Sequence, residues 1–348
     1  GDGGGGGDGD AARDADAGLL DPSQLKAAGE RLIRTILVMK HNGAIEKTRV
    51  GLACLGERLL RSSRRELSEL PGAWLEALFE RLRAPGQGVA DLIRRSAGIP
   101  AGFMAVFSAE PPGVPRALLH DAMRRLLDIA EDDGDDVRSG AVATGQSAGV
   151  HVPQVHAFNV VRAAFMDKEL STETTAFVER GIRVAMRGFS SPHWEVRNAA
   201  TLAFAALLVK VCGFMNTADS ASSKSGGGGT GRRGVTADEF FHRFCDLHRF
   251  LLDELAAAGD ALDARGALHP SLYPILAMLS RLRASAARAQ REDDVTRVAP
   301  SDFIPIVRRC AAGRPYAVRA AAARALAPLV NPGAAATVVG DLLSELAP

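Results

Sequence analysis

The sequence predicts an all-α chain built from helical repeats, and three observations lead to that prediction. Apolar residues recur at helical spacing along much of the chain, whereas the alternation typical of β-strands is almost absent. Only 2 Tyr and 2 Trp occur, while Ala, Leu and Arg are abundant. A pattern is also repeated, because VRNAATLAFAALL from Val196 aligns with VRAAAARALAPLV from Val318, a separation of 122 residues.

The repeated pattern indicates how the helices pack. Its small residues let adjacent helices approach closely, and its Val and Leu positions fill the space between them. The pattern resembles the second helix of a HEAT repeat, and the separation is close to three units of about 40 residues. We therefore predict a HEAT/armadillo-like α-solenoid with disordered inserts. Arg197 and Arg319 are expected to join a ladder of polar contacts between repeats, which is a structural role.

Apolar stripes mark individual helices. Each stripe places apolar side chains on one face with charged residues opposite, as in a helix that packs on a neighbour. The three clearest stripes are Leu119, Met123, Leu126, Leu127 and Ala130; Phe240, Phe244, Leu247, Leu251 and Leu255; and Leu272, Ile275, Leu276, Leu279 and Leu282. We predict a helix through each of them.

Two helix starts carry capping signals. In SSPHWEV, Ser191 is expected as the N-cap and Pro192 as the first helical residue, where its missing N–H costs nothing. In TADEFF, Thr236 is expected to cap the Glu239 amide while the Glu239 side chain reaches back, which is a capping box.

Low-complexity segments divide the chain. Their composition cannot bury enough apolar surface to offset the entropy of ordering, so we expect disorder in them. A weaker loop prediction covers 284–300. The predicted organisation is a disordered N-terminus at 1–24, helical repeats at 25–215 with a disordered insert at 131–149, a Gly/Ser-rich linker at 216–235, and helical repeats at 236–348.

Composition excludes several classes of protein. With 42 Lys+Arg against 41 Asp+Glu, bulk charge gives no reason to expect nucleic-acid or membrane attraction, so any basic surface must be local. The 4 cysteines form no CxxC pair and suit a reducing compartment. No run of apolar residues is long enough to span a membrane. The chain begins GDGGGGGDGD without methionine, and we expect it to be a piece of a longer protein.

Two short motifs imitate catalytic or phosphate-binding sites. GQSAG at 145–149 matches the nucleophile elbow around Ser147, but that elbow needs a preceding buried strand, and EDDGDDVRSGAVAT cannot form one. GGGGTGRR at 226–233 lacks the Lys-Ser/Thr pair of a phosphate loop and follows no strand. We interpret both segments as flexible.

A third motif imitates a metal site. HRFCDLH sets His242, Cys245 and His248 at i, i+3 and i+6, so one helix gathers two of them while the third lies around the cylinder. A partly buried helix face explains the three residues better than zinc does. With no triad, carboxylate pair or metal cage in the sequence, we predict a chain that is not itself an enzyme.

The stretch DLIRRSAGIPAGFMAVF, at 91–107, places two arginines against a break in an apolar helical region. In one interpretation Arg94 and Arg95 complement the negative end of a helix, Gly98 supplies the turn and Pro100 starts the next helix. In the other, the guanidinium groups contact RNA phosphate or a partner's carboxylates, while Ser96 and Gly98 allow close approach. The two interpretations are compatible.

Four blocks in order carry a family resemblance. They are MKHNGAIEKTRVGLACLGERLL from Met39, IRRSAGIP from Ile93, PQVHAFNVVRAAFMDKEL from Pro153, and GFSSPHWEVRNAATLAFAALL from Gly188. In this order they resemble the THADA family, and RRSAGIP looks like that family's signature, which usually ends in Leu-Pro. The resemblance covers roughly 25–283 and weakens through the inserts.

The resemblance implies a non-catalytic subunit. Members of the family assist an FtsJ-like tRNA methyltransferase in 2′-O-ribose methylation of the tRNA anticodon loop at position 32. The partner binds S-adenosylmethionine, so no cofactor is expected in this chain, and the expected partners are the methyltransferase and the tRNA anticodon region. A cytoplasmic location and no membrane partner are expected. The alternative is a general HEAT-repeat scaffold for protein partners with no RNA role.

Other candidate contact residues lie in the same blocks. Lys40 and His41 follow an apolar helix, so that a C-cap role and RNA contact are both open. Gln154, His156 and Asn159 do not share one helical face, so buried hydrogen-bonding roles are open for some of them, and Arg162 extends the polar set.

Overall fold

The computed structural model describes residues 21–84, 98–132, 153–211, 234–265, 268–285 and 299–346. Most of the predicted disordered segments, and Ser147 and the Gly-rich motif with them, lie outside these ranges. The chain forms two compact units, residues 1–204 and 205–348, with the boundary inside helix α13. Within the described residues every element is helical, apart from one isolated β-bridge between Thr236 and Arg283. The all-α prediction is confirmed.

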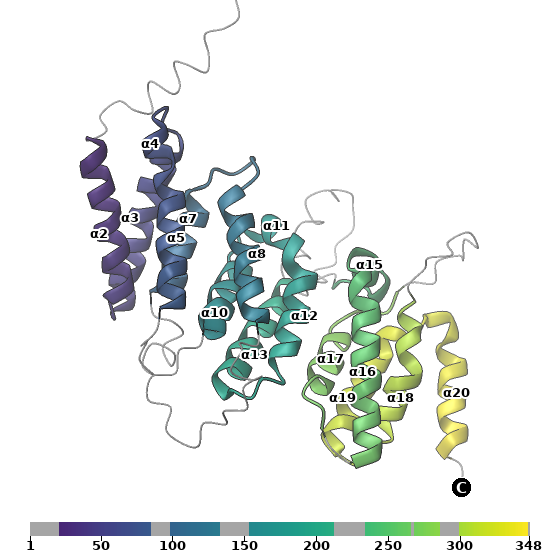
Figure 1. The fold of residues 1–348 in the computed structure, drawn as a ribbon. Coiled ribbons are helices and arrows are strands. Elements are labelled where there is room, and N and C mark those ends of the chain that lie inside the picture. The colour runs from purple at the N-terminus through teal and green to yellow at the C-terminus, as the bar shows by residue number, and fades with distance from the viewer. Residues whose placement is uncertain are drawn as a thin grey trace, which may run out of the picture. The chain divides into compact units, whose positions relative to one another are not determined.

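The first unit is a row of four helical hairpins. In each hairpin the two helices run side by side in opposite directions, and neighbouring hairpins stack so that their helices form two layers (Figure 1). The hairpins pair α2 (Pro22–Val38) with α3 (Asn42–Leu60), α5 (Leu70–Arg83) with α7 (Ile99–Ala109), α8 (Ala117–Glu131) with α10 (Pro153–Met166), and α12 (Val178–Gly188) with α13 (Trp194–Val209). Short helices α4 (Arg65–Ser68), α11 (Ser171–Thr174) and η1 (Thr175–Phe177) connect them.

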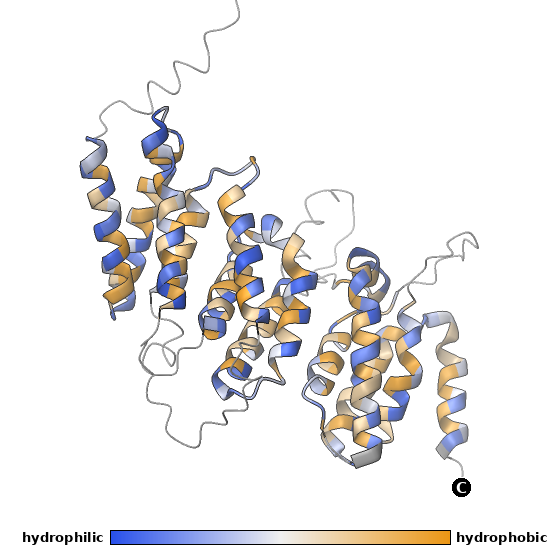
Figure 2. Cartoon of the chain, in the orientation of Figure 1, coloured by the Kyte–Doolittle hydropathy of each residue, from blue (hydrophilic) through white to orange (hydrophobic). Residues whose placement is uncertain are grey.

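Apolar faces of the helices meet between the layers, and the polar faces point outward (Figure 2). The stripe predicted around Leu119 to Ala130 is buried on α8. Glycines allow the closest contacts, because the Trp74 indole of α5 lies where a Cβ on Gly29 of α2 would be, only 2.3 Å from it. On α3, a Cβ on Gly56 would come within 2.9 Å of the Ala109 methyl group. Small residues in this unit therefore bring helices together, as the sequence pattern indicated.

Ion pairs join successive hairpins along the first layer. Arg125 of α8 binds Glu76 of α5 through two bonds of 2.5 and 2.8 Å, and its guanidinium lies 3.8 Å from the Phe79 ring centroid. Arg180 of α12 reaches back to Asp128 of α8 at 2.5 Å. Because these pairs are partly exposed, each is worth at most about 1 kcal/mol, and their contribution is mainly to the register between hairpins.

The second unit begins with α15 (Ala237–Arg243) and α16 (Cys245–Arg265). It continues through α17 (Leu272–Leu279), η4 (Pro300–Phe303), α18 (Ile304–Ala311), α19 (Tyr316–Leu329), η5 (Pro332–Ala334) and α20 (Ala335–Leu346) (Figure 1). The capping box at Thr236 and Glu239 is present, with the Glu239 amide 3.2 Å from the Thr236 hydroxyl. Arg309 of α18 bridges to Asp260 and Asp263 of α16 at 2.7 and 3.1 Å.

The helix through Phe240 to Leu255 is interrupted. All five residues of the predicted stripe are buried, but the backbone leaves helical geometry at Phe244, with φ −127° and ψ 63°, between α15 and α16. The periodicity continues across the break, so the apolar pattern alone does not reveal it.

The predicted roles of Arg197 and Arg319 are wrong in one respect. Each guanidinium binds its own preceding turn rather than the next repeat: Arg197 donates to the carbonyls of Ser191 and Pro192 at 2.7 and 3.0 Å. The helix begins at Trp194, so neither Ser191 as N-cap nor Pro192 as first helical residue is correct. The polar ladder between hairpins is formed by Arg125, Arg180 and Arg309 instead.

Helices α13 and α19, which carry the two copies of the repeated pattern, have one hairpin, α16 with α17, described between them. Residues 212–233 and 286–298 lie outside the described ranges, so the prediction of three repeat units between the copies stays a prediction.

Within the described ranges no single helix is long and apolar enough to cross a membrane. The segments Tyr316–Leu329 and Pro332–Glu345 reach the necessary length and composition only together, and they are bent by 113° at their break.

Candidate functional site

Each of the four family-resembling blocks includes residues at one edge of the first unit, and the blocks at 39–60, 153–170 and 188–208 also continue along α3, α10 and α13. Helices α2, α5, α8 and α12 end, and α3, α7, α10 and α13 begin, along the same side of the unit, which we call the turn edge (Figure 1). The blocks supply the α2–α3 turn, the start of α7, the start of α10 and the α12–α13 turn. Sequence segments more than a hundred residues apart therefore share one edge.

Gly98 joins two of these turns directly. It precedes α7, and a Cβ at this position would lie 1.7 Å from the carbonyl oxygen of Ile36, in the last turn of α2. Gly98 lies in a turn, as predicted, but its φ of −83° is ordinary for any residue, so the turn itself does not require glycine. The glycine is instead needed for contact with the α2 backbone. Arg94, Arg95 and Ser96 lie outside the described residues, and Pro100 is in the first turn of α7, as predicted.

Lys40 and His41 lie in the α2–α3 turn, beside the helix end that Gly98 contacts. Both side chains are exposed. Helix α2 ends at Val38 with Met39 in extended conformation, so neither residue is its C-cap. His41 caps the next helix instead, because its Nδ1 accepts a hydrogen bond from the Ala44 amide at 3.4 Å. Lys40 therefore offers its ammonium group to the surface at the turn edge.

The α10 residues divide by burial. Gln154 donates its side-chain amide to the Asp132 carbonyl, which ties the start of α10 to the end of α8. His156 and Asn159 are 0% and 5% exposed, so the interpretation as buried polar residues fits their geometry and a surface contact does not. Arg162 is half-buried. Of these four residues, only Gln154 and Arg162 present part of their side chains at the surface.

The α12–α13 turn holds a residue that the sequence argument did not select. Trp194 is 56% exposed at the first position of α13, while Val196 two residues later is buried in the core. The available signal was an aromatic residue out of phase with the apolar stripe, in a chain with only 5% aromatic residues. Arg197, one turn further on, is fixed to the preceding turn as described above.

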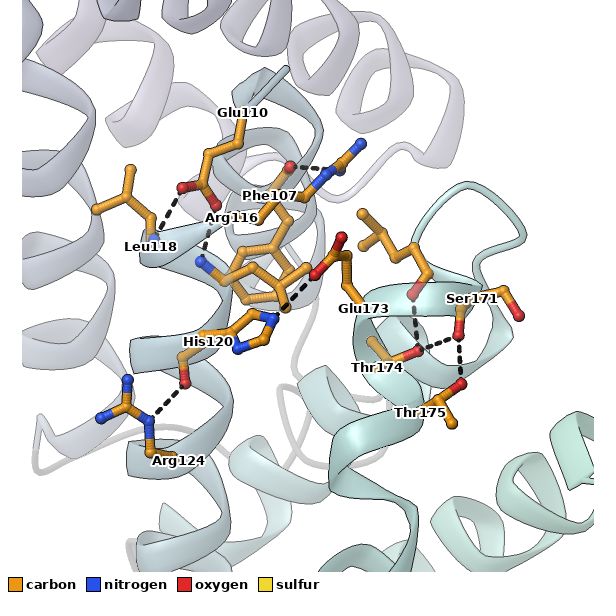
Figure 3. Close-up of polar contacts among 12 residues, drawn as sticks. Phe107, Glu110, Arg116, Leu118, His120, Arg124, Ser171, Glu173, Thr174 and Thr175 are labelled. Carbon is orange, nitrogen blue, oxygen red and sulfur yellow. Dashed lines mark hydrogen bonds and ion pairs between the residues drawn. The ribbon is translucent and has the colours of Figure 1, made fainter. Parts of the chain in front are cut away.

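The opposite edge of the first unit carries a polar cluster that is fully occupied in holding helices together (Figure 3). Glu110 accepts the Leu118 and Leu119 amides at 2.8 and 2.9 Å, which caps α8. Burial raises the pKa of Glu110, against the opposing effect of these two amides. Arg116 donates to the Phe107 carbonyl at 3.0 Å.

His120 belongs to the same cluster and meets Glu173 of α11 at 2.9 Å (Figure 3). Its ring also contacts Phe177 edge-on, with centroids 5.4 Å apart. The His120–Glu173 pair therefore links α8 to α11. Among the described residues, no serine, threonine or cysteine side chain is hydrogen-bonded to His120, as a catalytic nucleophile would be.

The predicted helix face at His242, Cys245 and His248 is confirmed in part. The three residues lie on two helices, because α15 ends at Arg243. His242 and Cys245 are exposed, while His248 is buried against Phe241 and Phe303 and lies 3.0 Å from the Ala299 carbonyl. No group of three or more His, Cys, Asp or Glu residues in the described part of the chain is placed to hold a metal ion.

Two family models match the chain and together cover most of its length. Residues 8–195 match the family described as "THADA/TRM732, DUF2428". The chain belongs to the THADA/TRM732 family. Residues 197–348 match "Trm732, C-terminal TPR repeats", which agrees with the helical hairpins of the second unit. The boundary between the two matches lies close to the start of α13.

Relatives in the THADA/TRM732 family align over nearly the whole chain. The "tRNA (32-2'-O)-methyltransferase regulator THADA" proteins of Canis lupus familiaris and Homo sapiens are each 33% identical over 338 residues, which cover 96% of this chain. The regulator trm732 of Schizosaccharomyces pombe is 28% identical over 326 residues. The chain spans only 16% of the length of the first two relatives and 20% of the third. No solved structure matches the chain.

Proposed function

We propose that this chain is the contact-bearing segment of a non-catalytic regulator, which assists an FtsJ-like methyltransferase in 2′-O-methylation at position 32 of the tRNA anticodon loop. The methyltransferase would bind S-adenosylmethionine and carry the catalytic residues. In this proposal the turn edge meets the RNA, or the partner enzyme and RNA together. Three curated relatives with the printed role of tRNA (32-2'-O)-methyltransferase regulator support the proposal.

One observation carries the assignment to the turn edge: all four family-resembling blocks reach it. The blocks also run along the buried lengths of α3, α10 and α13, which core packing explains. Core packing does not explain the residues that they place at the turn edge: the exposed Lys40 and His41 and the exposed Trp194. Turns on a rigid helical scaffold are where binding residues concentrate.

The electrostatics of the turn edge favour an anionic partner. Helices α3, α7, α10 and α13 begin there, so their N-terminal N–H groups carry partial positive charge toward this edge. Lys40 follows the end of α2 and Arg83 lies in the last turn of α5, where they oppose the negative ends of these helices. Arg187, in the last turn of α12, is paired with Glu131 at the end of α8. Although the net charge of the whole chain is only +1, these residues place positive charge locally at the turn edge.

The test is methyl transfer to unmodified tRNA by the methyltransferase, in the presence of the full-length protein that contains this segment. We expect Arg94→Glu with Arg95→Glu, and separately Lys40→Glu, to lower the stimulated rate or tRNA affinity by roughly tenfold. The matched control is Arg64→Glu with Arg65→Glu, which makes the same charge change at the opposite edge, where both side chains are exposed. Helicity should be unchanged in all variants.

Two results would contradict the proposal. Equal loss in the control variant would show a bulk charge effect rather than a contact at the turn edge. Normal stimulation by the Arg94/Arg95 variant, combined with loss of another protein partner, would favour the general scaffold without an RNA role.

A further inference from the structure

The two copies of the internal repeat share a surface feature as well as a core. Arg319 donates to the carbonyls of Gly313 and Arg314 at 3.1 and 2.6 Å, which are the positions six and five residues before it. Arg197 binds the carbonyls six and five residues before it in the same way. In both copies an aromatic residue precedes the arginine by three positions: Trp194 in one and Tyr316 in the other.

Both aromatic rings are solvent-exposed. Trp194 is 56% exposed and Tyr316 is 76% exposed, whereas the next apolar positions, Val196 and Val318, are 4% and 0% exposed. The valines therefore anchor the helices, and the rings add little to the core. Large exposed aromatic side chains are unusual in a chain with so few of them, and an unneeded apolar ring on the surface favours nonspecific association.

The guanidinium groups of Arg197 and Arg319 are held in place by backbone carbonyls and keep their positive charge. Each uses Nη1 to bind two backbone carbonyls, and no carboxylate among the described residues forms an ion pair with either arginine. The Arg319 guanidinium carbon lies 5.7 Å from the Tyr316 ring centroid. In the second copy a flat ring therefore lies near a positioned positive charge, and the first copy has the same aromatic–arginine spacing in the sequence.

We propose that Trp194 and Tyr316 are stacking platforms for unpaired RNA bases, with Arg197 and Arg319 holding the adjoining phosphates. Base–aromatic stacking next to cationic groups is the usual chemistry of single-stranded nucleic-acid binding. Other basic residues are close in sequence, since the exposed His193 directly precedes Trp194 and the exposed Arg314 comes two residues before Tyr316. The inference rests on the proposed function and extends it to the kind of RNA structure that is bound, an unpaired loop rather than a duplex.

Tryptophan emission gives a direct test. The chain contains 2 Trp, of which Trp74 is 4% exposed, so a quencher in solvent acts mainly on Trp194. The probe is an unmodified RNA hairpin with an unpaired loop, and its control is the same stem continued as a blunt duplex. We expect the hairpin to quench the emission of this chain, and the duplex to quench it much less.

Paired substitutions separate stacking from folding. Trp194→Leu and Tyr316→Leu keep an apolar side chain but remove the flat ring, and each should weaken hairpin binding by about fivefold or more in the anisotropy of a labelled hairpin. Trp194→Phe and Tyr316→Phe should retain the binding. Leu343→Ala is the control, because Leu343 is 63% exposed on α20 without an arginine in the equivalent place.

The inference is overturned if both leucine variants bind the hairpin as tightly as the unchanged protein. It is also overturned if the methyltransferase alone quenches Trp194 while the hairpin does not, because the rings would then contact protein. Stimulated methyl transfer in the same preparations separates the two proposals. If the unchanged protein stimulates and the leucine variants stimulate equally, the stacking role fails while the proposed function stands.

Discussion

Gly98 lies directly against the backbone carbonyl of Ile36, so the residue that opens α7 is in contact with the last turn of α2. A Cβ on Gly98 would come within 1.7 Å of the Ile36 oxygen. Neither group can move without displacing a helix. The Gly98 position in the RRSAGIP stretch is therefore required for packing, and that packing places the α2–α3 turn beside the start of α7.

Gly98→Ala should destabilise the first unit by about 3 kcal/mol, because the new methyl group meets backbone rather than a flexible side chain. The matched substitution is Gly51→Ala on the exposed face of α3, where a Cβ would meet nothing within 4 Å. That change should stabilise α3 by about 0.5–1 kcal/mol. Urea unfolding followed by circular dichroism measures both, and a Gly98→Ala protein as stable as the parent would refute the contact.

Lys210 should make the stability of the second unit depend on alkaline pH. The side chain is 0% exposed, and burial together with the charge of Arg243 lowers the pKa of Lys210 to about 8. The unfolded chain keeps this proton to about pH 10.5, so between pH 8 and 10.5 the unfolded state binds more protons and stability rises with pH. The cost at pH 7 is about 3 kcal/mol.

Lys210→Met should therefore raise the melting temperature at pH 7 and remove most of the rise between pH 8 and 10. Lys168→Met, at an exposed position, is the control and should leave the pH profile unchanged. Identical pH profiles for the parent and the Lys210 variant would show that the ammonium group is not buried as described.

Glu110→Ala should cost about 1–3 kcal/mol, because a buried and a partly buried amide at the start of α8 lose their acceptor. Glu69→Ala is the comparison: the Glu69 carboxylate bonds Arg65 at 2.6 Å, but both side chains are largely exposed. That loss should be about 0.5 kcal/mol or less. Thermal unfolding measures the difference, and equal effects would argue against the capping role.

Gln154→Ala should loosen the start of α10, since the Gln154 amide is bonded to the Asp132 carbonyl at the end of α8. The expected cost is about 1 kcal/mol, with faster amide exchange in the first turn of α10. Gln24→Ala, at an exposed site on α2, is the control. Unchanged exchange in the Gln154 variant would mean that the α8–α10 junction is held by apolar packing alone.

The sequence predicts a helix correctly where the helix depends only on residues that are close together in the chain. The apolar stripe from Leu119 to Ala130 and the capping box at Thr236 and Glu239 depend on neighbours within a few residues, and both are present. The capping signal in SSPHWEV predicts a start at Ser191, whereas α13 begins at Trp194 and the Arg197 side chain binds the Ser191 and Pro192 carbonyls. A side chain acting on the preceding turn is invisible to capping rules.

The site was predictable only in part, for a related reason. The blocks that reach the turn edge could be chosen from the sequence, but the contact between Gly98 and Ile36 joins residues far apart in the chain, and no local rule points to it. Burial of His156 and Asn159 likewise depends on how α10 packs against its neighbours. Trp194 was overlooked because an aromatic residue before a helix resembles core sequence until its exposure is known.

Hydrogen exchange of the full-length protein with unmodified tRNA and the methyltransferase tests the turn edge most directly. The account predicts slower exchange, relative to the free protein, in peptides covering 39–44, 94–100, 153–159 and 188–198. Peptides covering 61–69, 110–117 and 167–177, at the opposite edge of the same unit, should be unaffected. Protection confined to the opposite edge, or no protection at the turn edge in an assembly that methylates tRNA, would contradict the account.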